Sequence, residues 1–399
     1  MTHRCGGAVS GPPDISRRRR IMIVAGEASG DIYGADLVQK AFSLDSSLDF
    51  FGIGGSRMRE AGVKILVDSA EIAVMGLIEV LKHFDVISAA FLKLKKLLQQ
   101  DPPELLILID YPGFNLRLAK VAKKAGVKIL YYISPKVWAW KAGRIRKIAA
   151  TVSKMAVIFP FELPLYEKAG VPVSFVGHPM LDLVDVAMNR EEAVTSFALD
   201  PSRKTVGLFP GSRRSEIERI LPAIVAAAEL LHRRFPDLQF VMPLASTLRE
   251  EDIRPHLCGT GILPIITTQR IHDLIRGCDA IISVSGTVTL EIALVGTPMV
   301  IIYKLAPLTY QVASRVVKIK HIGLCNIVAD RSIVKELVQD QATPEAIADE
   351  ITMILSNETY RTTMNAELLS IRAKLGGGGA ALRTASLALD LINNKQDRV

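Results

Sequence analysis

A single carboxylate, Asp110, stands where a predicted buried strand ends. The apolar run Leu105–Ile109 precedes it, and Pro112 and Gly113 enforce a sharp exit from that strand. A partly buried aspartate with a raised pKa suits a general base, a group that takes a proton from an attacking hydroxyl. The alternative is that Asp110 only caps the turn. We favour the base interpretation and expect Asn115 to cap the helix that follows.

The stretch Pro210–Arg213 is predicted to be an anion-binding turn between a strand and a helix that Ser215 can cap. Gly211 lets the backbone approach a ligand, the helix start offers unpaired N–H groups, and Arg213 adds positive charge. Together these features suit a diphosphate. The alternative is a plain turn. We favour anion binding through Arg213 and expect Arg214 at the solvated surface.

A second turn in the same half, Ser285-Gly286-Thr287, again presents backbone N–H groups and hydroxyls at a predicted helix start. Glu291 lies one helical turn further and could accept both hydroxyls of a ribose, or could simply stabilise the helix dipole. The two turns together indicate one nucleoside diphosphate that spans them. Asn326, a polar residue in an apolar loop, either contacts the ligand or forms a turn.

The turn Gly26–Asp31 follows the short apolar run Met22–Ala25 and opens a helical pattern. Its glycines permit a tight backbone, and Ser29 or Asp31 can cap the helix. Glu27 and Asp31 would repel a phosphate, and the turn lacks both standard phosphate-loop motifs. It is therefore either a βα turn without a ligand or a functional turn of another kind.

Three further segments of the first half have alternative interpretations. Tyr131–Ile148 interleaves aromatic and cationic residues, which suits a packed loop, a base-stacking surface or a membrane rim. His178 either faces a ligand or is a structural histidine. Residues 72–84 are apolar on nearly all sides and either fill a core or lie in a membrane surface. Periodicity alone favours the core.

Strand-like runs alternate with helical patterns and position these turns. This alternation predicts α/β architecture with mostly parallel sheets, in which ligands bind at the carboxyl ends of the strands. A polar stretch at 181–204 separates two such units, and the final stretch from 345 is helical except for Gly376–Gly379. The predicted strands are Met22–Ala25, Phe50–Ile53, Leu105–Ile109, Lys128–Ile133, Met155–Phe159, Val173–Val176, Thr205–Phe209, Gln239–Met242, Ile262–Ile266, Ala280–Val284 and Met299–Tyr303.

Composition bounds the class of protein. A chain of 399 residues is long enough for two domains, and no window approaches the about 18 uninterrupted apolar residues that span a bilayer. Residues 1–20 lack a signal-peptide pattern and are expected to be a disordered extension or a misassigned start before Met22. Four scattered cysteines suggest a reducing, cytoplasmic setting. The net charge of +8 favours an anionic partner: nucleic acid, an acidic membrane or a phosphorylated substrate.

The motifs occur together in an order that resembles the lipid-A-disaccharide synthases of Gram-negative bacteria, over nearly the whole chain from about Met22. The residues that carry the resemblance are GEASGD (26–31), VMGLIEVL (74–81), DYPGFN (110–115), YYISPKVWAWKAGRIRKI (131–148), GHPM (177–180), PGSRRSEI (210–217), SGTVTLE (285–291), Asn326 and IVKELVQ (333–339).

The resemblance implies a GT-B fold: two facing Rossmann-like, doubly wound domains with a cleft between them. It implies an inverting transfer of 2,3-diacylglucosamine from its UDP derivative to 2,3-diacylglucosamine 1-phosphate (lipid X), with no essential metal and no cofactor. The expected domains are 21–180, rejoined by a last helix at 380–394, and 205–375. The expected location is the cytoplasmic face of the inner membrane, held peripherally, and a homodimer is one possible assembly.

The resemblance also distributes roles. Asp110 is the expected base, with Glu27 as the alternative, and Arg213 holds the donor diphosphate. The other donor-site residues are Gly211, Ser212, Ser285, Gly286, Thr287, Glu291, Asn326 and His178, and the acceptor side is lined by Glu27, Ser29, Gly30, Asp31 and Asn115. Acylated substrates shift the interpretation of the apolar segment towards membrane docking, through Val74, Met75, Leu77, Ile78, Leu81 and Phe84.

Two rival classes remain. Another GT-B enzyme, a UDP-GlcNAc transferase of peptidoglycan synthesis or a UDP-GlcNAc 2-epimerase, is disfavoured by the Glu27 turn and by the 72–84 segment. A nucleic-acid-binding module that uses Trp138 and Trp140 would bind oligonucleotides with strong salt dependence. The sequence carries no RNA-binding motif, so no nucleic-acid partner is expected.

Overall fold

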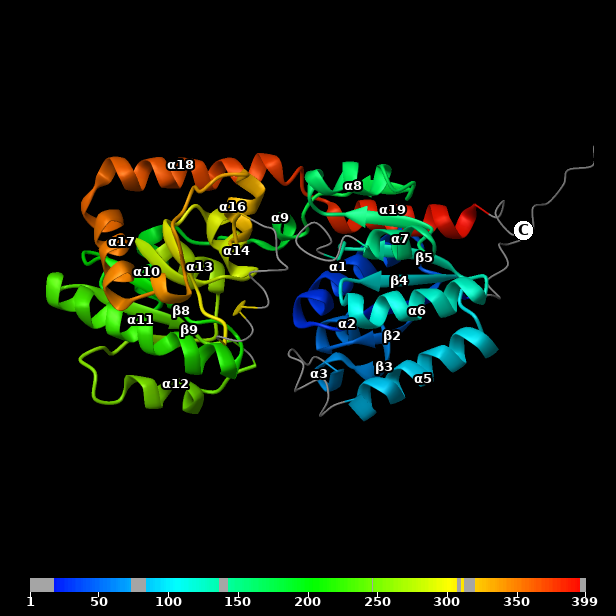
Figure 1. Cartoon of the computed structure of the whole chain (residues 1–399), viewed down its shortest axis with the longest axis horizontal. Coiled ribbons are helices and arrows are strands. Elements are labelled where there is room, and N and C mark those ends of the chain that lie inside the picture. Colours follow the sequence, from blue (N-terminus) through cyan, green and yellow to red (C-terminus); the bar gives the residue numbers. More distant parts are fainter. Residues whose placement is uncertain are drawn as a thin grey trace, which may run out of the picture. The chain divides into compact units, whose positions relative to one another are not determined.

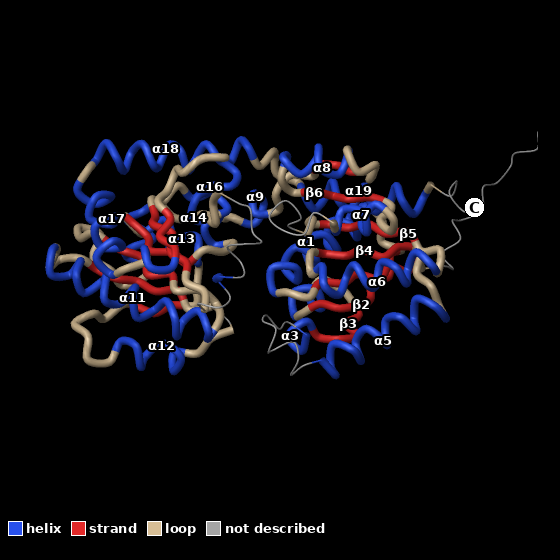
Figure 2. The backbone as a smooth tube through the Cα atoms, in the orientation of Figure 1, coloured by secondary structure: helices blue, strands red, loops and turns tan. Residues whose placement is uncertain are grey.

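The computed structural model describes residues 18–72, 84–135, 143–245, 247–306, 310–311 and 320–394. The chain divides into two compact units (Figures 1 and 2). The N-terminal unit runs to Val176 and includes the final segment from Gly379, and the C-terminal unit comprises Gly177–Gly378. Both units are parallel α/β sheets, as the alternation of runs predicted.

The described part of the N-terminal unit contains a seven-stranded parallel sheet in the order β3-β2-β1-β4-β5-β6-β7. The central strands β1 and β4 are apolar along their buried length, because helices cover both faces. The strands are β1 (Arg19–Ala25), β2 (Leu48–Gly54), β3 (Lys64–Asp68), β4 (Leu105–Ile109), β5 (Lys128–Tyr132), β6 (Lys154–Val157) and β7 (Val173–Phe175).

Alternate residues of these strands face two helical layers. Met22 and Leu108 belong to the core that α5 and α6 complete, whereas Ile109 packs against the glycines of α1. The last helix, α19, contacts α1, β4 and β5. The helices are α1 (Ala28–Leu44), α2 (Ser56–Glu60), α3 (Ser69–Ile72), α5 (Phe84–Gln100), α6 (Pro112–Lys124), α7 (Arg144–Ala149), η1 (Pro160–Glu162), α8 (Leu163–Glu167) and α19 (Ala380–Asn393).

The C-terminal unit repeats the plan with six described strands in the order β10-β9-β8-β11-β12-β13. The strands are β8 (Thr205–Phe209), β9 (Gln239–Pro243), β10 (Ile265–Thr267), β11 (Ala280–Val284), β12 (Met299–Tyr303) and β13 (Glu336–Val338). The helices are α9 (Met180–Leu183), α10 (Arg190–Ser196), α11 (Arg214–Arg234), α12 (Glu250–Leu257), α13 (Ile271–Gly277), α14 (Val288–Val295), α16 (Leu324–Ala329), η2 (Gln339–Gln341), α17 (Pro344–Ser356) and α18 (Glu358–Lys374).

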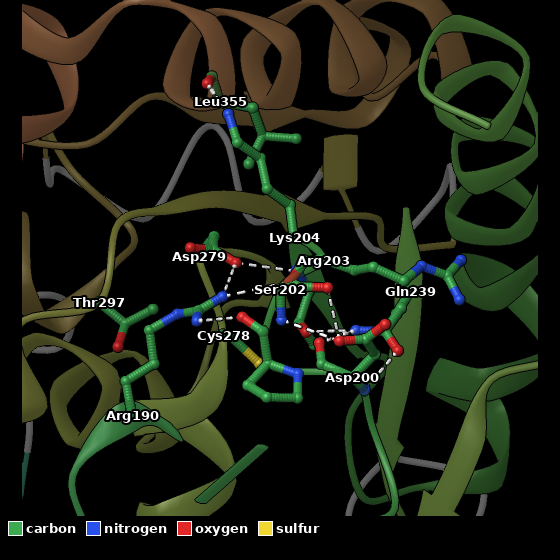
Figure 3. A network of polar contacts seen from close by, with 12 residues as sticks. Arg190, Asp200, Ser202, Arg203, Lys204, Gln239, Cys278, Asp279, Thr297 and Leu355 are labelled. Atoms are coloured by element: carbon green, nitrogen blue, oxygen red, sulfur yellow. Dashed lines mark hydrogen bonds and ion pairs between the residues drawn. The ribbon is translucent and has the colours of Figure 1, made fainter. Parts of the chain in front are cut away.

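A polar network fixes the amino ends of β8 and β11 (Figure 3). The Arg190 guanidinium of α10 donates to Asp279 Oδ2 at 2.6 Å, and the same oxygen accepts the N–H of Thr205 at 2.8 Å. The Lys204 ammonium donates to the carbonyl of Leu355 in α17 at 2.6 Å. These contacts hold the two central strands in register at the edge opposite to their carboxyl ends.

Several local predictions were wrong. Helix α1 begins at Ala28 with Glu27 at its N-cap, so neither Ser29 nor Asp31 caps it. Helix α11 begins at Arg214, so Ser215 does not cap it either. The strands β3 and β13 were not predicted, because β3 is only partly buried and β13 has only three residues. Within the described residues, no helix is long and apolar enough to cross a membrane.

Candidate functional site

In each sheet the strand order reverses between two central strands, β1 and β4 in one unit and β8 and β11 in the other. Ligands of open α/β sheets bind outside the carboxyl ends of strands at such a switch point. Ala25 and Ile109, the last residues of β1 and β4, pair with each other. Phe209, the last residue of β8, pairs with Ser283, which is the last residue but one of β11. The turn at Glu27 is therefore beside the turn at Asp110, and the Arg213 turn is beside Ser285.

The Asp110 turn is strained. Asp110 and Tyr111 have φ angles of 43° and 45°, in the left-handed region that non-glycine residues seldom adopt. Each such residue costs about 1–3 kcal/mol, and such strain concentrates at functional sites. The Asp110 carbonyl accepts hydrogen bonds from the Tyr131 hydroxyl at 2.6 Å and from Asn115 Nδ2 at 2.8 Å. These contacts fix the direction in which the chain presents residue 110.

Asn115 has a different role from the one expected. It is fully buried and donates to two carbonyls, those of Ile109 and Asp110, and it neither caps α6 nor reaches solvent. Its amide nitrogen therefore supports the strained turn from inside the unit. The sequence spacing placed it correctly near Asp110 but could not show on which side of the turn it lies.

Glu27 lies close to this turn. Gly26 packs so tightly that a Cβ there would stand 2.4 Å from the Tyr111 ring, which explains the glycine. Burial, and then the negative charge of Glu27, raises the pKa of the Tyr111 hydroxyl. Ser29 is partly exposed beside Glu27, while Gly30 is buried against Ala25 and Ile109. Glu27 and Asp110 thus share one end of the sheet.

Asp31 was predicted to line the acceptor side, and the structure gives it another task. Its carboxylate is buried and accepts three backbone N–H groups, from Gly55 at 2.6 Å, Arg57 at 3.1 Å and Met58 at 3.1 Å. It therefore caps α2 from a distant part of the sequence and ties α1 to the chain after β2. The expected role in ordering substrate hydroxyls does not fit these contacts.

Substitution of Asp31 by Ala is expected to lower the free energy of unfolding by about 3 kcal/mol, because three N–H groups, two of them buried, lose a charged acceptor. Urea denaturation measures this effect as a lower midpoint with an unchanged slope. Asp390→Ala, at an exposed position on α19, is the matched control and should change stability by less than about 0.5 kcal/mol. Equal midpoints for the two variants would contradict the capping role.

The carboxylate of Glu216, from the same chain, is hydrogen-bonded to the Arg213 turn. Gly211 has φ 107°, and a Cβ there would lie 2.6 Å from Glu216 Oε2. The Glu216 carboxylate accepts the N–H of Ser212 at 3.2 Å and the Arg213 guanidinium at 2.6 Å. The donors expected for a diphosphate thus converge on one carboxylate, which a bound diphosphate would have to displace. Glu216 was not predicted to take part, although glutamate at the third position of a helix is a known capping signal.

The second turn of this unit presents exposed backbone. Gly286 and Thr287 are exposed, and a Cβ on Gly286 would meet nothing within 4 Å. The Ser285 hydroxyl donates to the Ile322 carbonyl at 2.9 Å, so its proton is used inside the unit. Glu291, in the first turn of α14, is 3.2 Å from the ring nitrogen Nε2 of His272. The turn therefore exposes the backbone of Gly286 and Thr287 just before α14, and the Glu291 carboxylate lies in the first turn of that helix.

Asn326 and His178 are internal residues. Asn326 is fully buried; its Oδ1 accepts the N–H groups of Ile333 and Val334, and its Nδ2 donates to Glu336 at 2.8 Å. It forms the turn that was the alternative to ligand contact. His178 is 2% exposed, its Nδ1 accepts the N–H of Met180, and burial lowers its pKa to about 3. A neutral, buried imidazole supplies no charge to a diphosphate.

The membrane-segment residues Val74, Met75, Leu77, Ile78 and Leu81 lie outside the described residues, as do Trp138 and Trp140, and the side chain of Phe84 is not described. Ile72, which precedes that segment, is fully buried in the core. Among the residues that the structure does describe, no group of three potential metal ligands is found.

The two switch-point sheets define the class of protein: an α/β protein of the GT-B type. The UDP-GlcNAc 2-epimerase of Neisseria meningitidis, solved with bound UDP-GlcNAc, shares this fold with a TM-score of 0.64 at 14% identity, over 93% of this chain and all of that one. MurG of Acinetobacter baumannii shares it with a TM-score of 0.57 at 14% identity, over 93% of this chain and 99% of that one.

Proteins of higher sequence identity show to which family the chain belongs. The family model for lipid-A-disaccharide synthetase matches residues 21–384. The lipid-A-disaccharide synthase of Trichlorobacter lovleyi is 64% identical over 378 residues, 95% of this chain and 99% of that protein. The corresponding protein of Geobacter metallireducens is 56% identical over 378 residues, 95% of this chain and 98% of its own. The chain belongs to the lipid-A-disaccharide synthase family, glycosyltransferases of lipid A biosynthesis.

Proposed function

We propose that this chain transfers 2,3-diacylglucosamine from its UDP derivative to the 6-hydroxyl of 2,3-diacylglucosamine 1-phosphate, with inversion at the anomeric carbon. The products are the β-1′,6-linked disaccharide 1-phosphate and UDP. Family membership supports the substrates, and one observation supports the assignment of residues. In both sheets, chemically competent side chains follow the strands at the switch point.

The proposed mechanism is a single displacement. Asp110 removes the proton of the acceptor 6-hydroxyl as its oxygen attacks the anomeric carbon, and the bond from that carbon to the diphosphate oxygen breaks. Charge then develops on the leaving UDP, where the Arg213 guanidinium and the backbone N–H groups at the start of α11 stabilise it. Glu27, in the turn beside Asp110, is the alternative base.

The donor nucleotide is proposed to bind the C-terminal unit. Its diphosphate occupies the place that Glu216 now holds against Ser212 and Arg213, and its ribose hydroxyls bind Glu291. The backbone of Gly286 and Thr287 adds N–H donors between the two, whereas the Ser285 N–H donates to the Ile302 carbonyl at 3.0 Å. This assignment uses no metal ion, because a guanidinium and N–H groups supply the positive charge.

Acceptor-dependent release of UDP tests the proposed reaction. Purified protein in detergent, with EDTA, should release UDP from the donor only when the acceptor is present. An acceptor analogue that lacks the 6-hydroxyl should give no release above background. Release without acceptor, or equal release with the analogue, would contradict the transfer reaction.

We also propose that the protein docks on the anionic inner membrane from the cytoplasmic side through the apolar residues 74–84 and the cations of α5. The described face of α5 supports this: Val86 and Leu92 are 38% and 60% exposed, and Lys93 and Lys96 are exposed beside them. Apolar side chains interleaved with cations suit an anionic lipid surface.

Replacement of Leu77, Leu81 and Phe84 by Glu is expected to abolish co-sedimentation with phosphatidylglycerol vesicles, because three charges enter the proposed apolar contact. Circular dichroism and the melting temperature establish that the triple variant is folded. A control with Glu at the exposed Leu263, in the C-terminal unit, should sediment as the parent does. A folded triple variant that sediments normally would contradict the proposal.

A further inference from the structure

His272 contacts the proposed ribose-binding carboxylate, and none of the motifs above includes it. It lies in the first turn of α13, and α13 packs against α14, which carries Glu291. The imidazole Nε2 is 3.2 Å from Glu291 Oε2, and the two side chains are only 16% and 19% exposed. A contact with this little solvent around it can fix the direction of the carboxylate.

The second ring nitrogen determines which proton the imidazole carries. The backbone N–H of Asp185 points at His272 Nδ1 at 3.3 Å, so Nδ1 is the acceptor. A neutral imidazole that accepts at one nitrogen carries its proton on the other. Nε2 therefore bears the hydrogen and donates it to Glu291 Oε2. Within the described part of the chain, Glu291 Oε1 accepts no hydrogen bond, which leaves it for a ligand.

The helix that carries His272 is firmly held. The neighbouring Asp273 is 3% exposed and accepts the N–H groups of Ala187 and Met188, each at 3.0 Å. Arg270, which precedes the helix, has φ 45°, a left-handed conformation that is unfavourable for arginine and that persists where the surroundings impose it. The segment 185–188 and the strained residue Arg270 together fix the start of α13, and so they fix the position of the His272 imidazole.

We propose that His272 is a positioning residue of the donor site: its Nε2–H fixes the Glu291 carboxylate so that the carboxylate accepts the ribose hydroxyls of the UDP-sugar. This inference rests on the proposed function, in which Glu291 binds ribose. The alternative is that His272 only attaches the segment around Asp185 to α13. In that case its loss would affect every ligand of this unit equally.

Calorimetric titration of the full chain with two ligands separates these roles. UDP carries both ribose hydroxyls, and 2′,3′-dideoxy-UDP carries neither. His272→Ala should weaken UDP binding about tenfold, since a hydrogen bond to a charged group loses its alignment. It should change the affinity for 2′,3′-dideoxy-UDP by less than about twofold, because that ligand makes no bond to Glu291.

Two further variants complete the test. His272→Gln places an amide N–H where Nε2–H stands and should restore UDP affinity to within about threefold of the parent protein. His256→Ala, on α12, is the matched control and should leave both affinities unchanged. Equal weakening of both ligands by His272→Ala, or no weakening of UDP, would overturn the positioning role. Failure of the parent protein to bind UDP would instead contradict the proposed donor site.

Discussion

Asp110→Asn is expected to lower the turnover number by about a thousandfold, within the range that a positioned general base contributes. Asparagine has the shape of aspartate and tolerates the left-handed backbone that residue 110 adopts, so the strained turn should persist. The amide cannot take the acceptor proton at neutral pH. The loss should therefore fall on turnover, while UDP affinity, which we assign to the proposed donor site in the other unit, stays within about twofold.

Glu27→Gln is the matched variant, because Glu27 is the alternative base in the neighbouring turn. If Asp110 is the base, Glu27→Gln should reduce turnover far less than Asp110→Asn does. Single-turnover measurements with saturating donor and acceptor give the chemical step directly. Nearly full activity of Asp110→Asn, combined with an inactive Glu27→Gln, would transfer the role of base to Glu27.

Arg213→Ala is expected to lower kcat/KM for the UDP-sugar by about two to three orders of magnitude, the loss typical when one donor to a developing charge is removed. The guanidinium is 47% exposed and lies 2.6 Å from the Glu216 carboxylate, so its removal also leaves that carboxylate without its cation in the proposed diphosphate site. Both effects oppose a diphosphate. Steady-state kinetics with varied donor, together with UDP titration, measures the loss.

Arg214→Ala provides the control for charge alone. Arg214 is 68% exposed and pairs with Asp252 at 3.1 Å. Its removal takes the same charge from the next residue and should change kcat/KM by less than about threefold. If the two variants lose activity equally, general attraction of an anionic substrate explains the arginines, and the specific contact does not.

The sequence could predict which turns carry the candidate site residues, because those turns follow from short-range patterns. Each strand–turn–helix run placed its candidate residue, Asp110 or Arg213 among them, after a buried strand. Ligands bind at the carboxyl ends of parallel strands, and this rule predicts that they bind near these turns. The parallel sheets of both units, and the adjacency of the turns at Glu27 and Asp110, follow from this logic.

The sequence could not predict which polar residues face inward. Asp31 binds N–H groups 24 to 27 positions away, and Asn326 binds residues seven to ten positions away. Both contacts depend on how elements pack, which no local pattern records. His272 gave no signal for the same reason, since only the packing of α13 on α14 brings it to Glu291. Asp31 and Asn326 are therefore structural residues, because their buried side chains are hydrogen-bonded inside the unit. His272, which lies outside every motif, is a candidate for a role in the donor site.

The linkage and configuration of the product test the central proposal most directly. The full-length protein is incubated in detergent with UDP-2,3-diacylglucosamine and 2,3-diacylglucosamine 1-phosphate, and the lipid product is analysed by mass spectrometry and proton NMR. We expect a disaccharide 1-phosphate linked at position 6 of the acceptor, and its new anomeric proton should show the large coupling of the β configuration. An α-linked disaccharide, hydrolysed sugar without a disaccharide, or donor epimerised at C2 would contradict the proposal.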